Sequence, residues 1–168
     1  MKTIILTVMF CALACFAQAQ EVMKAAARLG PSSNSKVTGT VTFTKVGDEV
    51  QVVANILNLT PGKHGFHIHE KGDCSAPDAS SAGAHFNPTT KHHGGPETAD
   101  HHTGDLGNIE ADASGKARLD WKGKLSLSGA DSIIGKSVVV HEKEDDLKTD
   151  PSGNSGARIA CGVINAAN

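Results

Sequence analysis

The chain has 168 residues, a formal net charge of −2 at pH 7 and only 4% aromatic residues. It holds no basic cluster with interleaved aromatic residues, which argues against a nucleic-acid partner. It also lacks the glycine-rich loop that cradles phosphates in P-loop proteins. The length suffices for one domain with a sizeable hydrophobic core.

The first 19 residues predict a secretory signal peptide. Lys2 is the only charge there, the run that follows is almost wholly apolar, and Ala17-Gln18-Ala19 has the small-x-small form of a cleavage site. Because the run is short for a membrane span, we expect cleavage after Ala19 and no membrane contact afterwards. The exported domain is then residues 20–168, in a periplasm or outside the cell. The alternative is a lipid anchor on Cys15.

Removal of the leader would also remove two of the four cysteines and leave Cys74 and Cys161. Two cysteines in an exported chain most simply form one disulfide, and the alternative is two free thiols. Closing a loop of this length stabilises a fold by roughly 4–5 kcal/mol in the chain-entropy model.

Alternating apolar and polar residues predict β-strands through the ordered part of the chain. The predicted strands, in chain order, are residues 36–44, 49–56, 63–69, 117–121 and 137–141. Val46-Gly47-Asp48 predicts a hairpin between the first two strands, and no long amphipathic helix is evident. Short strands with frequent glycine turns indicate an all-β sandwich or barrel.

Two long segments break this alternation. Residues 71–108 are rich in Gly, Pro, Ser and Asp and contain five histidines, and residues 142–157 are also irregular. A loop of this length in a compact domain is usually functional or disordered. Since the first segment contains many histidines and a cysteine near its start, we expect the chemistry in these two loops.

The sequence Gly65-Phe66-His67-Ile68-His69-Glu70 offers the first candidate ligands. Residues i and i+2 of a strand point to the same face, so the imidazoles of His67 and His69 lie side by side. Copper and zinc favour such nitrogen donors. The pair alone is equally compatible with a polar sheet face.

Other candidate ligands follow in the two irregular segments and at the end of an apolar run. They are His85, His92, His93, His101, His102, Asp105 and His141. Their spacing indicates a multi-histidine metal site with one carboxylate. It does not decide which member of each adjacent pair, His92/His93 or His101/His102, is a ligand.

Six blocks of the chain together resemble copper,zinc superoxide dismutase, in that family's order and at nearly its spacings. They are residues 65–70 (GFHIHE), 81–88 (SAGAHFNP), 93–96 (HGGP), 102–108 (HTGDLGN), 139–142 (VVHE) and 158–164 (RIACGVI). The resemblance implies a Greek-key β-barrel or sandwich, immunoglobulin-like, with two long functional loops.

The resemblance also implies a site, residue by residue. The copper ligands fall on His67, His69, His85 and His141, and the zinc ligands on His85, His93, His102 and Asp105, with His85 bridging the two metals. His92 and His101 then read as exposed bystanders and His64 as structural.

Three further roles follow from the same resemblance. Asp145 matches a carboxylate that links a copper ligand to a zinc ligand, and Cys74 and Cys161 match the disulfide. His85 and Arg158 are the expected catalytic residues: the histidine handles a proton, and the guanidinium attracts and docks anionic superoxide.

The implied activity is dismutation of superoxide to dioxygen and hydrogen peroxide, with a copper ion and a zinc ion as cofactors. The alternatives are a periplasmic copper/zinc carrier of the same fold and a zinc hydrolase, which would need an open zinc site. The segment between Asp146 and Arg158 is shorter than in the common cytosolic enzymes, which resembles secreted bacterial forms. The resemblance allows a homodimer but does not define its interface.

Overall fold

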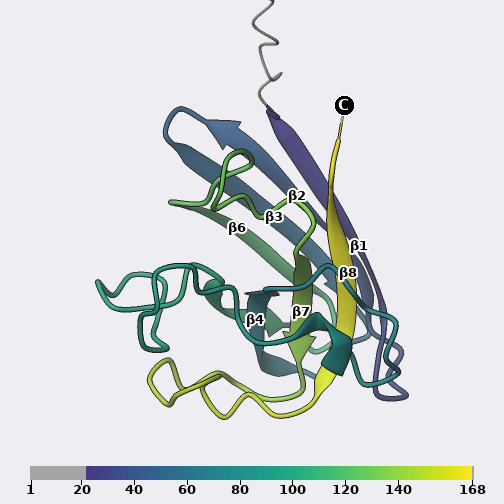
Figure 1. Cartoon of the computed structure of the whole chain (residues 1–168). Helices are drawn as coiled ribbons and strands as arrows, with labels where there is room; N and C mark the ends of the chain where they lie inside the picture. The colour runs from purple at the N-terminus through teal and green to yellow at the C-terminus, as the bar shows by residue number, and fades with distance from the viewer. Residues whose placement is uncertain (1–21, 168) are drawn as a thin grey trace, which may run out of the picture.

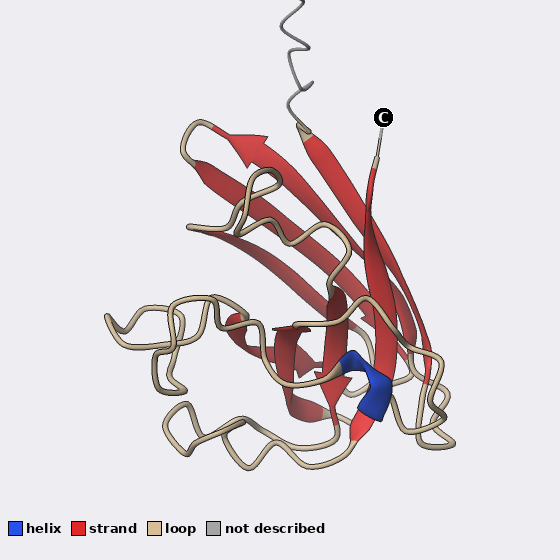
Figure 2. Ribbon diagram, in the orientation of Figure 1, coloured by secondary structure: helices blue, strands red, loops and turns tan. Residues whose placement is uncertain are grey.

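The computed structural model describes residues 22–167, which contain eight β-strands, one short turn of 3₁₀ helix and the loops between them (Figure 2). The helical turn, η1, is Ser80–Ala82. The strands are β1 (Lys24–Pro31), β2 (Thr38–Val46), β3 (Glu49–Leu57), β4 (Gly62–His69), β5 (Asp105–Ala111), β6 (Ala117–Gly123), β7 (Ser137–His141) and β8 (Arg158–Ala166).

The strands close into an antiparallel barrel in the order β1-β2-β3-β6-β5-β4-β7-β8. The β3–β4 and β6–β7 connections each pass over two strands, which is the Greek-key arrangement. The contact between β5 and β6 is narrow, with one paired position, Ala111 opposite Ala117. The predicted all-β Greek-key barrel is confirmed.

The core follows from the two-residue period of the strands. In β3, Val50, Val52, Ala54 and Ile56 are buried while their neighbours face outward. Burial of the valine and isoleucine side chains contributes about 1.5–3 kcal/mol each, and the buried face sets the register of the strand.

Strands β4 and β7 differ, because β7 is buried along its whole length and β4 over all but its first two residues. Phe66 and Ile68 of β4 point into the barrel core. His67 and His69 point the other way and are still no more than 1% exposed, since the long loops cover that outer face. A second apolar cluster, which includes Val139 of β7, lies under the same covering loops.

The structure contains three strands that the sequence did not predict, namely β1, β5 and β8. In β1, the inward residues include Ala25 and Ala27, and alanine is a weak strand former. β5 begins inside the segment that was expected to be loop throughout, which therefore ends at Gly104.

Both long loops gather at one end of the barrel, beside β4 and β7 (Figure 1). The first runs between β4 and β5, the second between β7 and β8. Within residues 22–167, no helix has the length and hydropathy required to cross a membrane. The predicted signal peptide lies outside the described residues.

Candidate metal centre

The first group of candidate ligands stands on the outer face of β4 and β7. His67 and His69 alternate with the core residues of β4, and His141 is the last residue of β7. The two strands pair so that His67 lies opposite Val139 and His69 opposite Ser137. The ring centroid of His141 lies 4.9 Å from that of His67 and 5.6 Å from that of His69.

His85 joins this group from the first loop. It forms an isolated antiparallel bridge with His69, which brings its ring centroid within 4.1 Å of the His67 ring and 4.9 Å of the His69 ring. All four histidines are buried, and one nitrogen of each lies within 4.8 Å of the others.

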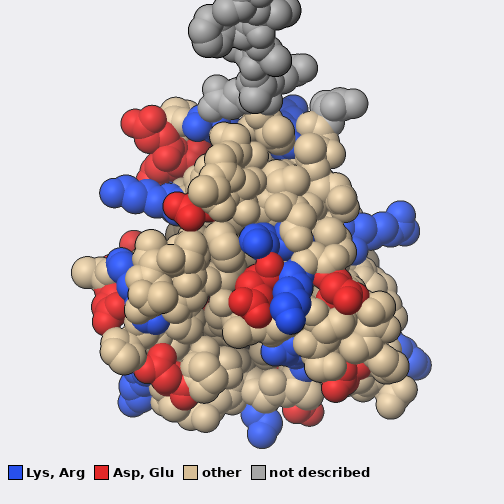
Figure 3. Space-filling view, in the orientation of Figure 1, with Lys and Arg blue, Asp and Glu red and all other residues tan. Residues whose placement is uncertain are grey.

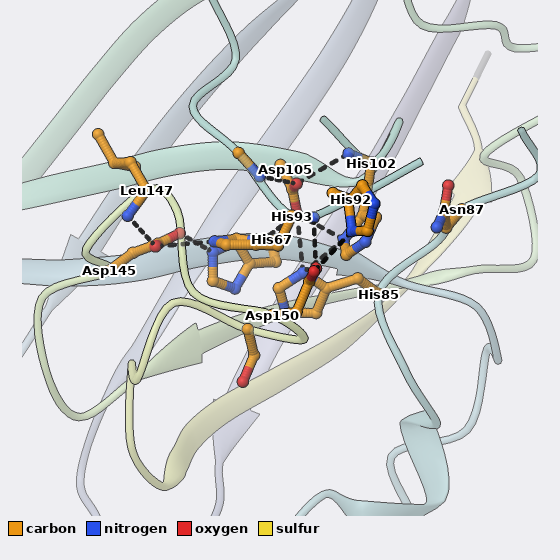
Figure 4. Close-up of polar contacts among 12 residues, drawn as sticks. His67, His85, Asn87, His92, His93, His102, Asp105, Asp145, Leu147 and Asp150 are labelled. Carbon is orange, nitrogen blue, oxygen red and sulfur yellow. Dashed lines mark hydrogen bonds and ion pairs between the residues drawn. The ribbon is translucent and has the colours of Figure 1, made fainter. Parts of the chain in front are cut away.

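A second group of four shares His85 with the first. His93 and His102 come from the first loop, and Asp105 opens β5. Asp105 is the centre of this group: its Oδ1 lies 2.7 Å from His85 Nδ1, 3.1 Å from His93 Nδ1 and 3.2 Å from His102 Nδ1. Its Oδ2 accepts the backbone N–H groups of Gly94 and His102, at 3.1 and 2.9 Å, and so orders the loop (Figure 4).

Three buried ring nitrogens in these groups make no hydrogen bond: His67 Nδ1, His85 Nε2 and His93 Nδ1. A buried polar atom without a partner costs about 1–3 kcal/mol, and such atoms are rare in native folds. Their positions, aimed into the two groups, match the need of a metal ion for unprotonated nitrogen donors.

The opposite ring nitrogens are held by partners that set the tautomers. His69 Nδ1 donates to the carbonyl of Gly83 at 2.9 Å, and His141 Nδ1 lies 3.3 Å from the carbonyl of Gly156. The Nε2 atoms of these two rings then face each other at 3.4 Å with lone pairs free for a metal. The donor set therefore fits two metal ions that share one histidine.

Asp145 connects the two groups from the second loop. Its Oδ2 lies 2.7 Å from His67 Nε2 and its Oδ1 2.9 Å from His93 Nε2 (Figure 4). The carboxylate is fully buried and is held by the Leu147 N–H at 2.7 Å. Its backbone exchanges two hydrogen bonds with the Asn108 side chain, at 2.8 and 2.9 Å. Such outer partners fix the orientation of ligands and raise their basicity.

The electrostatics differ between the groups. Burial, followed by the neighbouring histidines, lowers the pKa of His141 to about 3. Burial likewise lowers the pKa of His85 to about 4 and holds that of His69 well below its ordinary value. These rings are neutral at pH 7, as metal ligands must be.

His93 shifts in the opposite direction. Burial opposes its charge, but the carboxylates of Asp105, 3.1 Å from Nδ1, and Asp145, 2.9 Å from Nε2, outweigh burial and raise its pKa to about 10. The pKa values of the two carboxyl groups fall well below the usual range: burial acts against this shift, and hydrogen bonds from His85, His67 and His93 overcome it.

Arg158, the first residue of β8, lies at the mouth of the first group. Its Nη1 donates to the Ala79 carbonyl at 2.8 Å and its Nη2 to the Gly83 carbonyl at 2.7 Å. The guanidinium is partly buried and lines one pocket together with His69, His85, His141, Pro151 and Ser152.

The Cys74–Cys161 disulfide is confirmed, with a Cα–Cα distance of 5.7 Å and a sequence separation of 87. It ties the start of the first loop to β8, three residues beyond Arg158. Ala79 and Gly83, whose carbonyls orient Arg158, belong to the loop that this bond pins.

The remaining histidines lie outside both groups. His92 is exposed and pairs with Asp150, while His101 Nδ1 donates to the Thr98 carbonyl at 2.6 Å. His64 is buried, and its Nδ1 donates to the His141 carbonyl at 2.8 Å.

Two contributors to the site were missed by sequence reasoning. Asn108 lies in one of the matching blocks, which was a usable signal. Asp150 has no such signal, because nothing local reveals its contact with His93, 57 residues away.

Comparison with known proteins decides the family. A model of the copper/zinc superoxide dismutase family matches residues 37–164. The chain belongs to this family. An extracellular copper-zinc superoxide dismutase of Drosophila melanogaster is 43% identical over 98% of both chains, and that of Caenorhabditis elegans is 44% identical over 89% of this chain and 72% of the relative.

A solved structure shares the fold. The crystal structure of the clock protein EA4 matches with a TM-score of 0.81 at 43% identity, covering 89% of this chain and 98% of that one. The predicted enzyme class, superoxide dismutation, and the copper and zinc cofactors are confirmed. The expected likeness to secreted bacterial forms finds no support, since the similar relatives named here are animal proteins.

Proposed function

We propose that His67, His69, His85 and His141 hold copper, and that His85, His93, His102 and Asp105 hold zinc. The observation that carries this division is the set of unpartnered buried nitrogens, one of which is Nε2 of the shared His85. Three nitrogens and a carboxylate form a closed set for zinc. Four nitrogens beside an accessible pocket suit a redox copper ion.

When bound, copper supplies the one-electron chemistry by which one superoxide leaves as dioxygen and a second leaves as hydrogen peroxide, while zinc has no redox chemistry and stabilises the site. The rest of the work falls to the chain. Asp145 bonds to His67 of the first group and to His93 of the second, and so fixes the orientation of both rings. The carbonyls of Gly83 and Gly156 keep His69 and His141 in the tautomer that presents Nε2.

Arg158 binds and orients the substrate. Its two bonds to loop carbonyls hold the guanidinium beside His69 and His141, where it attracts the superoxide anion. Basic and acidic side chains are interspersed on the face shown in Figure 3, so attraction over that face is weak. Docking therefore depends on the guanidinium within the pocket.

His85 handles the proton. Its Nε2 faces the first group and its Nδ1 faces Asp105, so one ring can serve both groups only when both nitrogens are unprotonated. When Nε2 does not serve the first group, it is the atom at which the site would hold a proton for the departing peroxide.

The protein acts outside the cell, as the extracellular relatives support. Cleavage after Ala19 and a mature domain of residues 20–168 belong to this proposal. Mass spectrometry of protein from the culture medium tests it: a mature chain that begins at Gln20 is expected, and a lipidated Cys15 would contradict it.

The deciding experiment combines metal analysis with an assay. Purified mature protein is expected to bind one copper and one zinc per chain and to dismutate superoxide. Disulfide-bonded, copper-loaded protein that is no more active than free copper would instead favour a metal carrier of the same fold.

A further inference from the structure

Asp150 joins the two long loops at a point outside both metal groups. Its Oδ1 accepts the backbone N–H of His93 at 2.7 Å, and its Oδ2 accepts the side-chain Nδ1–H of His92 at 2.7 Å (Figure 4). The first loop contributes His93 to the second group, and Asp150 lies 57 residues further along the chain. The Asp150 carboxylate thus holds the backbone of His93, a candidate zinc ligand.

The residues that follow Asp150 form a wall of the substrate pocket. Pro151 and Ser152 line it together with Arg158. Next, Gly153 packs against Asp145, and its N–H donates to the Thr149 carbonyl at 2.7 Å, which closes a tight turn around Asp150. The same turn therefore contacts the second metal group, the carboxylate that links the groups and the mouth of the pocket.

The two contacts of Asp150 differ in strength. The His92 side chain is 79% exposed and that of Asp150 50%, and an ion pair at such a site contributes little. The bond to His93 N–H is a charge-assisted bond to partly buried backbone, which is stronger. The backbone contact is the part that fixes geometry.

We propose that Asp150 is a positioning residue, which holds the His93 backbone and the Pro151–Ser152 wall in one arrangement through its bond to the His93 N–H. The proposal rests on the assignment of His93 to zinc. Asp150 attaches the shortened second loop directly to the first loop, which carries His93. The order of the zinc site and the width of the pocket mouth therefore both depend on this carboxylate.

The first test measures zinc release to a chelator from protein loaded with both metals. Asp150→Ala is expected to release zinc about 10-fold faster than the parent chain. Asp150→Asn keeps an oxygen that accepts the His93 N–H, and His92→Gln removes only the exposed partner, so both are expected to stay close to the parent. Asp100→Ala is the matched control, since Asp100 accepts the His92 N–H at 3.3 Å within the first loop alone.

The second test reads the pocket wall. In the copper-loaded protein, the visible spectrum is titrated with azide and with the larger phosphate ion. Asp150→Ala is expected to bind phosphate more tightly relative to azide, whereas Asp150→Asn keeps the ratio of the parent. A merely destabilised protein would not change this ratio.

Contrary outcomes are distinct. If Asp150→Ala releases zinc at the rate of the parent chain, the proposal is overturned. It is also overturned if Asp150→Asn and Asp150→Ala both release zinc equally fast, because that result would assign the effect to the ion pair with His92. If the parent chain itself retains no zinc, the metal assignment fails and the positioning role falls with it.

Discussion

The two halves of the metal centre are built by different means. In the copper half, the group proposed to hold copper, His67, His69 and His141 are strand residues, and His85 is bridged to His69. In the zinc half, the group proposed to hold zinc, His93 and His102 come from a loop, and only Asp105 begins a strand. Sheet pairing fixes the first half, whereas the second depends on side-chain hydrogen bonds and a disulfide.

This difference predicts how each half fails. A strand ligand keeps its position as long as the barrel stands, because neighbouring strands and the core fix its backbone. A loop ligand keeps its position only while its specific partners remain, here Asp105, Asp145 and Asp150. Changes in the loops should therefore affect zinc before copper.

Loss of a strand ligand should give the largest change in activity. His141→Ala removes one of four copper donors, and we expect activity to fall to the free-copper background while the fold persists. Asp105→Ala should chiefly lower zinc content and stability. Metal content by mass spectrometry, together with the assay, measures both. Equal loss of copper from the two variants would contradict the separation of the two halves.

Removal of the disulfide should come next in size. The bond spans 87 residues, and Cys74→Ser with Cys161→Ser is expected to lower the free energy of unfolding by roughly 4–5 kcal/mol. Denaturant unfolding of the metal-free protein measures this loss. Since the bond pins the first loop, zinc should also be retained less well than copper. A loss of less than about 1 kcal/mol would show that the loop is held by its other contacts.

Gly153→Ala adds one carbon atom, Cβ, beside the zinc half and tests its tolerance of a small displacement. Gly153 has φ of +62°, and an added Cβ would lie 1.7 Å from Asp145 Oδ1, so the carboxylate must move away from His93. We expect zinc affinity to fall about 10- to 100-fold. Gly47→Ala is the matched control, with φ of +63° and no atom within 4 Å of the new Cβ. A similar loss in both variants would attribute the effect to backbone strain.

Arg158 depends on both kinds of support, because it starts β8 but bonds to carbonyls of the first loop. Arg158→Ala should lower kcat/KM about 10-fold, equivalent to roughly 1.4 kcal/mol of substrate attraction, and leave metal content unchanged. Arg158→Lys keeps the charge without the forked geometry, so its kcat/KM should lie between that of the parent chain and that of Arg158→Ala. If Arg158→Ala loses copper as well, the guanidinium is part of the metal framework.

The sequence predicted the copper half better than the zinc half. The His67-x-His69 alternation on a strand is local, and period-two geometry alone places both rings on one face. The choice of His93 over His92 is not local, since both are loop residues and only Asp105 and Asp145 distinguish them. Strand β1 was missed because its inward alanines lack the β-branched signal.

The pH dependence of the metal-free protein should separate the halves most finely. The folded-state pKa values of His141 and His85, about 3 and about 4, lie below that of an unfolded histidine, about 6.5. The unfolded chain therefore binds more protons in acid, and these residues reduce stability as pH falls below about 6.5. The pKa values of Asp105 and Asp145 are also lowered, so their contribution is present above about pH 4 and is lost in stronger acid.

His93 has the opposite sign. Its folded-state pKa of about 10 exceeds the unfolded value, so its contribution is complete below about pH 6.5 and is lost as pH rises toward 10. Urea unfolding at pH 5, 7 and 9 should show His141→Gln flattening the acid side and Asp145→Asn flattening the alkaline side. Unchanged slopes in both variants would mean that neither half sets the pH dependence. Bound metals should suppress the alkaline slope, because a coordinated His93 holds no extra proton in the folded state, whereas the acid slope should persist, because the unfolded histidines still take up protons.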